Sequence, residues 1–267
     1  MPPETGKLLK SSPPYMHVYK LFKATKALDG ISMEAMFAEM DEMGISKVIT
    51  TGIDIETTVG FRIPNESIAS LVKKYSERFV GGAGIDPLKG MRAVREIEHY
   101  VREYGFKCVK ILPYALGLPP TDRRYYPVFA KCVELDVAVW MQVGHAGPLL
   151  PSDPGRPIYL DTVALDFPEL RVIGGHIGWP WTEEMIAVAW KHPNIYVDTS
   201  AHVPSHYPPE FVRFIKTFGR EKVIFGTDYP LLTWRRCVSE IGALGLQGEI
   251  LENFLFRNAK RAFKLET

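Results

Sequence analysis

The sequence has 267 residues, of which 46% are hydrophobic and 24% charged, and its net charge is +1. This balance is typical of a globular protein with a sizeable core, and it provides no global field that would recruit nucleic acid or an anionic membrane. The three cysteines are too scattered for a disulfide framework or a C-x-x-C zinc site, and no apolar run approaches the ~20 residues of a membrane helix. We therefore expect a cytoplasmic protein without nucleic-acid or membrane partners.

Short apolar runs alternate along the chain with segments that carry the helical period. Seven runs are predicted strands, at 46–50, 79–85, 108–112, 137–144, 171–175, 195–198 and 222–227. Helical periodicity predicts helices at 33–43, 68–75, 94–104, 128–133, 182–191, 209–217, 233–244 and 247–264. Strands that alternate with helices predict a parallel sheet covered by helices.

Seven regular strand–helix units are best explained by an α/β fold of the TIM (β/α)8 type, as a single domain over residues 1–267. No G-x-G-x-x-G or G-x-x-x-x-G-K-S/T motif follows the early strands, which argues against a nucleotide-binding fold. A closed barrel of this type has eight strands. One strand is therefore expected to be missing.

Three side chains able to hold a metal ion or move a proton each follow a predicted strand: His145, His176 and Asp228. Loops beyond the carboxyl ends of parallel strands meet at one edge of the sheet, so the three are expected to share a site. Imidazole suits zinc, and a histidine between glycines can act as general acid or base. Asp228 can bind a metal and accept a proton from metal-bound water. Each residue also has a structural interpretation, as a hydrogen-bonded core histidine, a strand cap or a helix N-cap.

Four further residues are predicted to contact a small-molecule substrate. Lys110 interrupts an apolar strand, where it either holds a substrate carboxylate, bridges metals after carbamylation, or extends its amine to the rim. Trp179 and Tyr229 supply aromatic walls, and His202 follows a strand that ends at the same mouth.

Seven segments occur in an order that resembles a known family. They are 36–45, 78–87, 105–111, 145–147, 175–178, 193–200 and 225–230. The ordered set resembles the amidohydrolase-related metal-dependent hydrolases and decarboxylases, a family that includes aminocarboxymuconate-semialdehyde decarboxylase and γ-resorcylate decarboxylase.

The resemblance implies that His145, His176 and Asp228 surround a divalent metal, zinc more than manganese, with His176 and Asp228 as the catalytic residues. The function we expect is metal-dependent hydrolysis of a small organic acid, ester, lactone or amide. Two alternatives stay open: non-oxidative decarboxylation, and a catalytically silent barrel that binds a ligand. The oligomeric state is open too, with a homodimer as the candidate assembly.

One departure from the family concerns the metal. The family's first strand carries a His-x-His pair, and this sequence contains no such pair. We interpret the missing strand and the missing ligands as one omission, either because the chain begins downstream of that strand or because the strand was lost. Catalytic zinc sites usually have three or more protein ligands, so weak metal occupancy is expected.

Overall fold

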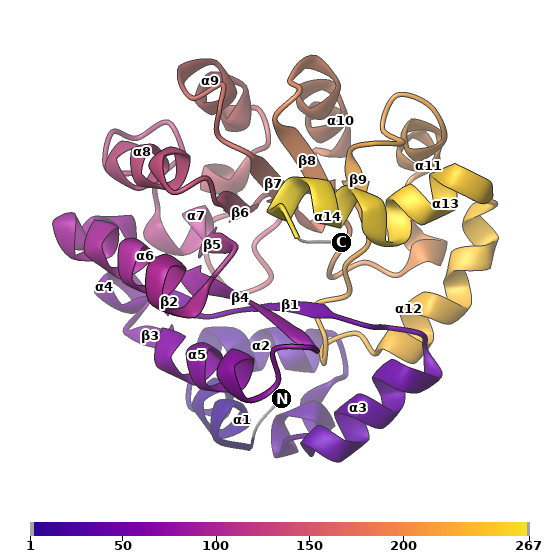
Figure 1. The fold of residues 1–267 in the computed structure, drawn as a ribbon, viewed down its shortest axis with the longest axis horizontal. Coiled ribbons are helices and arrows are strands. Elements are labelled where there is room, and N and C mark those ends of the chain that lie inside the picture. The colour runs from indigo at the N-terminus through magenta and orange to yellow at the C-terminus, as the bar shows by residue number, and fades with distance from the viewer. Residues whose placement is uncertain (1–2, 266–267) are drawn as a thin grey trace.

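A parallel sheet of seven strands, curled into a partial barrel, organises the computed structural model, which describes residues 3–265 (Figure 1). The strand order along the sheet is β1 (Val48–Thr51), β4 (Phe79–Gly84), β5 (Cys108–Ile111), β6 (Ala138–Gln142), β7 (Val172–Gly175), β8 (Ile195–Asp198) and β9 (Val223–Ile224). All seven predicted strands are therefore confirmed. The predicted strand at 222–227 is shorter because Gly226 donates its N–H to the Thr199 Oγ1, at 3.1 Å, which ends the backbone ladder.

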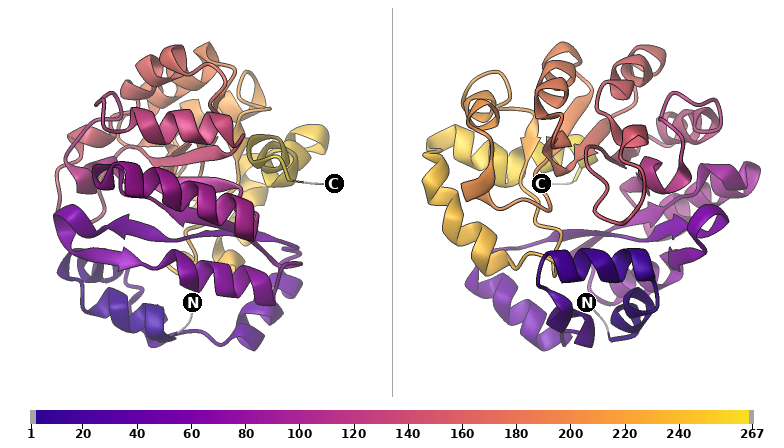
Figure 2. Two further views of the ribbon diagram at one scale, coloured as in Figure 1. Left: turned by 60° about the vertical axis from the view of Figure 1, so that its left-hand side comes forward. Right: turned by 180° about the vertical axis from the view of Figure 1, so that it is seen from behind.

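Helices cover the outside of the sheet, as expected for parallel strands buried on both faces (Figures 1 and 2). Those in this outer layer are α5 (Asn65–Lys74), α6 (Met91–Tyr104), α8 (Tyr126–Glu134), α9 (Tyr159–Asp166), α10 (Thr182–Lys191) and α11 (Pro209–Lys216). The other helices are α1 (Pro3–Lys10), α2 (Pro13–Leu21), α3 (Met33–Glu42), α4 (Glu56–Val59), α7 (Pro113–Leu116), α12 (Trp234–Glu240), α13 (Gly248–Glu252) and α14 (Asn258–Phe263). No helix within residues 3–265 is both long and apolar enough to cross a membrane.

Local signals in the sequence account for several helix ends. The Ser32 hydroxyl accepts a hydrogen bond from the Ala35 N–H at 3.2 Å and begins α3. Gly105 follows α6 in the left-handed conformation, with φ 65°, and closes that helix. The predicted helix at 182–191 has the same limits as α10.

Other elements were not predicted from the sequence. Helices α1, α2 and α9, and an antiparallel hairpin of β2 (Ile53–Ile55) and β3 (Phe61–Ile63), lie in segments without a clear period. The predicted helix at 247–264 is divided into α13 and α14 by a π-helical turn, Asn253–Arg257. The Asn258 amide donates to the Val223 and Arg220 carbonyls, at 2.7 and 3.1 Å, and so attaches this segment to the end of the sheet.

The sheet is open between β1 and β9, and this seam is where an eighth strand would close the barrel. On β9 the outer edge is covered, because the Phe225 N–H donates to the Phe254 carbonyl at 3.0 Å. On β1, Val48 and Gly52 donate their N–H groups to the β4 side. Hydrogen bonding alternates along a strand, so the N–H groups of Ile49 and Thr51 point away from β4, toward the seam.

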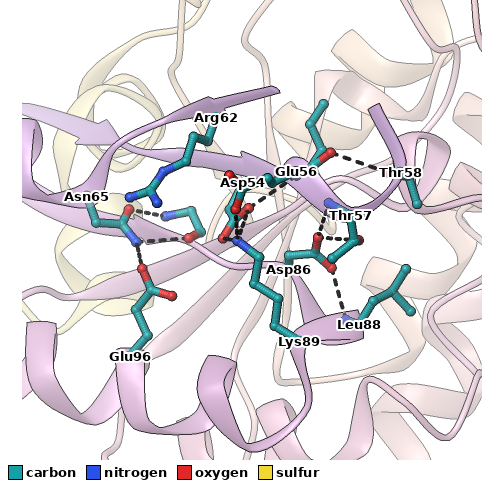
Figure 3. A network of polar contacts seen from close by, with 12 residues as sticks. Asp54, Glu56, Thr57, Thr58, Arg62, Asn65, Asp86, Leu88, Lys89 and Glu96 are labelled. Carbon is teal, nitrogen blue, oxygen red and sulfur yellow. Dashed lines mark hydrogen bonds and ion pairs between the residues drawn. The ribbon is translucent and has the colours of Figure 1, made fainter. Parts of the chain in front are cut away.

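The β2–β3 hairpin is held beside the carboxyl end of the sheet by a buried ion network (Figure 3). The Lys89 ammonium donates to both oxygens of Asp54, at 2.8 and 2.6 Å, and to Glu56 at 2.9 Å. Only 7% of the Lys89 side chain and 6% of the Asp54 side chain are exposed. Phe61 of this hairpin packs on the Tyr15 ring of α2, with 4.5 Å between ring centroids. The network thereby positions α2 as well as the hairpin.

We predict that the amides of Ile49 and Thr51 exchange with solvent deuterium at least about tenfold faster than those of Val48 and Gly52, because local opening free energies are lowest where no backbone partner exists. Residue-resolved hydrogen exchange by NMR measures this directly. Equal protection of all four amides would show that another group occupies the β1 edge in solution.

Replacing Lys89 by Met is predicted to lower the free energy of unfolding by roughly 3–5 kcal/mol, because it leaves the buried Asp54 carboxylate without its cation. Urea unfolding followed by circular dichroism measures the change. The matched control is Lys10→Met, which removes an exposed ion pair with Asp29 and should cost about 0–1 kcal/mol. Similar losses in the two variants would contradict a structural role for the Lys89 network.

Candidate active site

A cavity of about 1530 Å³ lies inside the curled sheet, larger than the roughly 300–1,000 Å³ of most ligand pockets. It reaches from the loops at the carboxyl ends of the strands to Ile49 and Ile224 deeper in the sheet. All seven predicted site residues line it: Lys110, His145, His176, Trp179, His202, Asp228 and Tyr229. Strand-end residues that lie far apart in the sequence therefore line one cavity.

The predicted metal ligands do not form a metal centre. Within residues 3–265, no three His, Cys, Asp or Glu side chains are arranged so that they could hold one ion. His145 is exposed, and its ring lies edge-on to Trp179 with 5.6 Å between centroids. His176 instead points its Nδ1 at Ser200, and Asp228 is exposed to the cavity. The donors present in this part of the chain do not fit a metal ion with the usual three or more protein ligands.

His176 belongs to a hydrogen-bonded chain that ends on a buried carboxylate. Its Nδ1 lies 3.0 Å from both the carbonyl oxygen and the Oγ of Ser200. The Ser200 hydroxyl donates in turn to the Asp198 carboxylate, which also accepts from the Trp140 indole N–H at 3.0 Å. Burial raises the pKa of Asp198, whereas the His176 charge and the hydrogen bonds from Ser200 and Trp140 act in the opposite direction.

Two glycines make room for this arrangement. A Cβ on Gly226 would lie 2.0 Å from the Asp198 Oδ1, and a Cβ on Gly175 would lie 2.2 Å from the Trp140 ring. No other residue type fits at either position without displacing these side chains. The glycine that precedes His176 is thus explained by the space that Trp140 requires, and Gly226 by the space that Asp198 requires.

The Trp140 indole contacts both the Lys110 ammonium and the His176 imidazole. The Lys110 ammonium lies 4.4 Å from the centroid of the indole, and the His176 ring meets the same indole edge-on at 5.2 Å. Lys110 forms no ion pair with any residue in the part of the chain that the structure describes. The amine is therefore stabilised by the indole face and is free to meet an anionic group in the cavity.

The backbone at the mouth adopts conformations that L-residues seldom use. His176, Ile177, Ala201 and Asp228 have φ values of 65°, 51°, 62° and 63°. The β-branched Ile177 is an uncommon residue in this region. Such conformations persist where the surrounding contacts hold them, and they concentrate at functional sites. All four lie at or beside residues predicted from the sequence.

His202 is a neutral imidazole beside His176. Its Nδ1 lies 3.3 Å from the Ser200 carbonyl oxygen. Burial, together with the nearby charges of His176 and His206, lowers the pKa of His202 to about 4, and the backbone hydrogen bond to Ser200 acts in the opposite direction. The ring is therefore uncharged at neutral pH.

Three tyrosines that the sequence did not single out as a group line the same cavity: Tyr15 and Tyr19 of α2, and Tyr114. The Tyr15 and Tyr114 hydroxyls lie 3.4 Å apart. Burial raises the pKa of all three phenols, and the negative charge of Asp228 raises it further. Nothing in the N-terminal sequence marks a strand end, so only the packing of α2 reveals Tyr15 and Tyr19 as site residues.

Tyr229 and Trp179 are placed differently from each other. The Tyr229 ring stacks on the Trp234 ring, with 3.8 Å between centroids, and the Tyr229 hydroxyl donates to the Glu39 carboxylate at 3.2 Å. These contacts attach the tyrosine to α3 and α12. Trp179 is 48% exposed at the cavity rim, where an aromatic wall for a ligand was predicted.

Comparison with known proteins places these features in a family. The amidohydrolase family model matches residues 26–265. A 2-keto-4-carboxy-3-hexenedioate hydratase from Sphingobium sp. is 27% identical over an alignment 196 residues long, which covers 61% of this chain. The match spans only 56% of the length of that curated relative.

Solved structures share the fold. A TIM-barrel protein from Bordetella bronchiseptica is 26% identical, with a TM-score of 0.79 over 90% of this chain and 85% of its own. A dihydroxybenzoic acid decarboxylase from Polaromonas sp., crystallised with manganese and 2-nitroresorcinol, is 20% identical, with a TM-score of 0.68 over 90% of this chain and 88% of its own. Further structural relatives are decarboxylases of 5-carboxyvanillate and 2,6-dihydroxybenzoate. The sequence match over nearly the whole chain and the barrel-like sheet agree, and the chain belongs to the amidohydrolase family of enzymes.

Proposed function

We propose that the protein is a non-oxidative carboxy-lyase that removes carbon dioxide from a small planar carboxylic acid. This replaces hydrolysis, which the sequence had favoured, with the alternative that it left open. The relatives above that carry the name of an activity support the change, because they are decarboxylases and one hydratase. Addition of water to an unsaturated acid is the second candidate, which the hydratase relative supports.

The observation that carries the proposal is the pair of side chains on the Trp140 indole. Lys110 offers an unpaired cation and His176 an imidazole, 4.4 and 5.2 Å from the same ring centroid. A planar acid that lies in this cavity can bind an anionic group to Lys110 while its reacting carbon faces His176. The neutral His202 and the rim residue Trp179 complete the proposed substrate contacts. Tyr229 is hydrogen-bonded to α3 and stacked on α12, so its proposed role is to support the cavity wall.

In the proposed reaction, protonated His176 gives a proton to the carbon that bears the carboxylate. The carbon–carboxylate bond then breaks, its electron pair returns to the substrate π-system, and neutral carbon dioxide leaves. Loss of a charged carboxylate is favoured where apolar walls solvate charge poorly. The reaction takes up one proton overall, which comes from solvent and returns His176 to its protonated form. Asp228, whose charge acts on the phenols of Tyr15, Tyr19 and Tyr114, is the proposed group that relays this proton.

The proposal includes a divalent metal ion as a cofactor but assigns it neither an identity nor a step in the reaction. The Polaromonas relative was crystallised with manganese, and both zinc and manganese suit histidine and carboxylate ligands. His145 and Asp228 are the candidate ligands here, but residues 3–265 contain no three-ligand group, so no step is assigned to the ion. The cytoplasmic location and the homodimer stay predictions.

We predict that the purified chain retains well below one zinc or manganese ion after dialysis, because too few ligands converge to form a catalytic site. Inductively coupled plasma mass spectrometry, after incubation with either ion and dialysis, measures the occupancy. A stoichiometric ion that survives dialysis would show that the cavity side chains rearrange into a complete ligand set.

Decarboxylation is tested by supplying dihydroxybenzoates, 5-carboxyvanillate and 2-keto-4-carboxy-3-hexenedioate, each with and without added Mn²⁺ or Zn²⁺, and measuring carbon dioxide release and product by NMR. We expect His176→Asn to lower kcat by about 10²–10⁴-fold, the usual contribution of a general acid or base. Lys110→Met should raise KM with a smaller effect on kcat.

The matched control is His206→Asn, which changes an exposed histidine close to His202 and should leave both constants unchanged. Water addition without carbon dioxide release would favour the hydratase candidate. Hydrolysis of ester or lactone analogues, with no turnover of the acids, would restore the original hydrolase expectation and overturn the proposal.

A further inference from the structure

One backbone carbonyl contacts two imidazoles at the mouth of the cavity. The Ser200 oxygen lies 3.0 Å from the Nδ1 of His176 and 3.3 Å from the Nδ1 of His202. A carbonyl oxygen can only accept hydrogen bonds, and it has two lone pairs. Both contacts are hydrogen bonds only if each Nδ1 carries the hydrogen. In the neutral rings, Nε2 is then the unprotonated nitrogen of both histidines.

The Ser200 residue is itself held by Asp198. The Asp198 carboxylate accepts from the Ser200 hydroxyl and, at 3.3 Å, from the Ser200 N–H. It also accepts from the Trp140 indole N–H at 3.0 Å, so it has three donors and only 6% of its surface exposed. Neither histidine is hydrogen-bonded to Asp198 directly. The hydrogen-bonded connection between the carboxylate and the two rings therefore runs through Ser200.

The loop after β8 turns sharply at this point. Ala201, between Ser200 and His202, has φ 62°, in the left-handed region. The loop brings His202 back to the Ser200 carbonyl, while the same carbonyl faces His176 from the neighbouring strand β7. A conformation of this kind needs outside support, which the hydrogen bonds of Ser200 to Asp198 provide.

We propose that Asp198 and Ser200 are positioning residues that hold His176 and His202 in the Nδ1–H tautomer, so that both rings offer Nε2 to the substrate. The catalytic consequence rests on the proposed carboxy-lyase function, but the tautomers do not. His202 is neutral, so its Nε2 acts as a hydrogen-bond acceptor. His176 is the ring that gains and loses the proton.

The tautomers are measured by long-range ¹H–¹⁵N NMR of the full chain labelled with ¹⁵N-histidine, with signals assigned through His176→Asn and His202→Asn. We expect an Nδ1–H pattern for both rings. Ser200→Ala and Asp198→Asn should each shift His176 toward the Nε2–H form, and Trp140→Phe, which removes one donor to Asp198 but keeps an aromatic ring, should do so more weakly. Unchanged ring spectra in Ser200→Ala and Asp198→Asn would overturn the proposal, as would an Nε2–H pattern in the wild-type protein.

Ser205→Ala is the matched control, because Ser205 lies on the same loop but its hydroxyl donates to Glu240 at 2.6 Å. It should leave the histidine spectra unchanged. Thermal unfolding of each variant separates lost positioning from lost structure, and a variant that does not fold is replaced in the comparison by Trp140→Phe.

In the activity assay, Ser200→Ala and Asp198→Asn should lower kcat by about 10–100-fold while KM stays within about twofold, because misplacing a catalytic group mainly affects the chemical step. A rise in KM without a fall in kcat would contradict the positioning role. The predicted tautomers combined with no carbon dioxide release from any acid would reject the proposed function and leave this inference standing. Carbon dioxide release combined with histidine tautomers other than those predicted would reject only the inference about Asp198 and Ser200.

Discussion

The buried carboxylate of Asp198 constrains much of the site around it. A charged group at the end of a parallel strand must find donors, and here it takes the indole N–H of Trp140 together with the hydroxyl and N–H of Ser200. Trp140 is consequently held where it contacts both Lys110 and His176. The absence of a side chain at Gly226 follows from the same requirement, because the carboxylate occupies that space.

The open seam between β1 and β9 determines how far the cavity extends. Because β1 and β9 do not pair, the cavity extends into the sheet interior as well as to the mouth. The C-terminal segment protects the β9 edge through Phe254 and Asn258, whereas no backbone hydrogen bond from residues 3–265 covers the outer edge of β1 at Ile49. Helix α2, which the sequence did not predict, forms part of the cavity wall. Its tyrosines, Tyr15 and Tyr19, line the same cavity as Asp228.

Family membership and site geometry lead to different expectations about the metal. The structural relative from Polaromonas sp. was crystallised with manganese, but His145, His176 and Asp228 of this chain do not form a three-ligand group within residues 3–265. His176 points its Nδ1 at Ser200, and His145 lies against Trp179. Imidazole, carboxylate and ammonium groups remain in one cavity, which supports acid–base chemistry on a small anion.

The sequence by itself determined the seven strands, most of the outer helices and the family, because these depend on hydrophobic period and on residues close together in the chain. It also placed His145, His176 and Asp228 at one cavity, since parallel strands end at a common edge. Which way each side chain points was decided only by the tertiary structure. The orientation of His176 depends on Ser200, 24 residues away, and on Trp140 and Asp198 behind it. Contacts between residues so distant in sequence leave no local pattern.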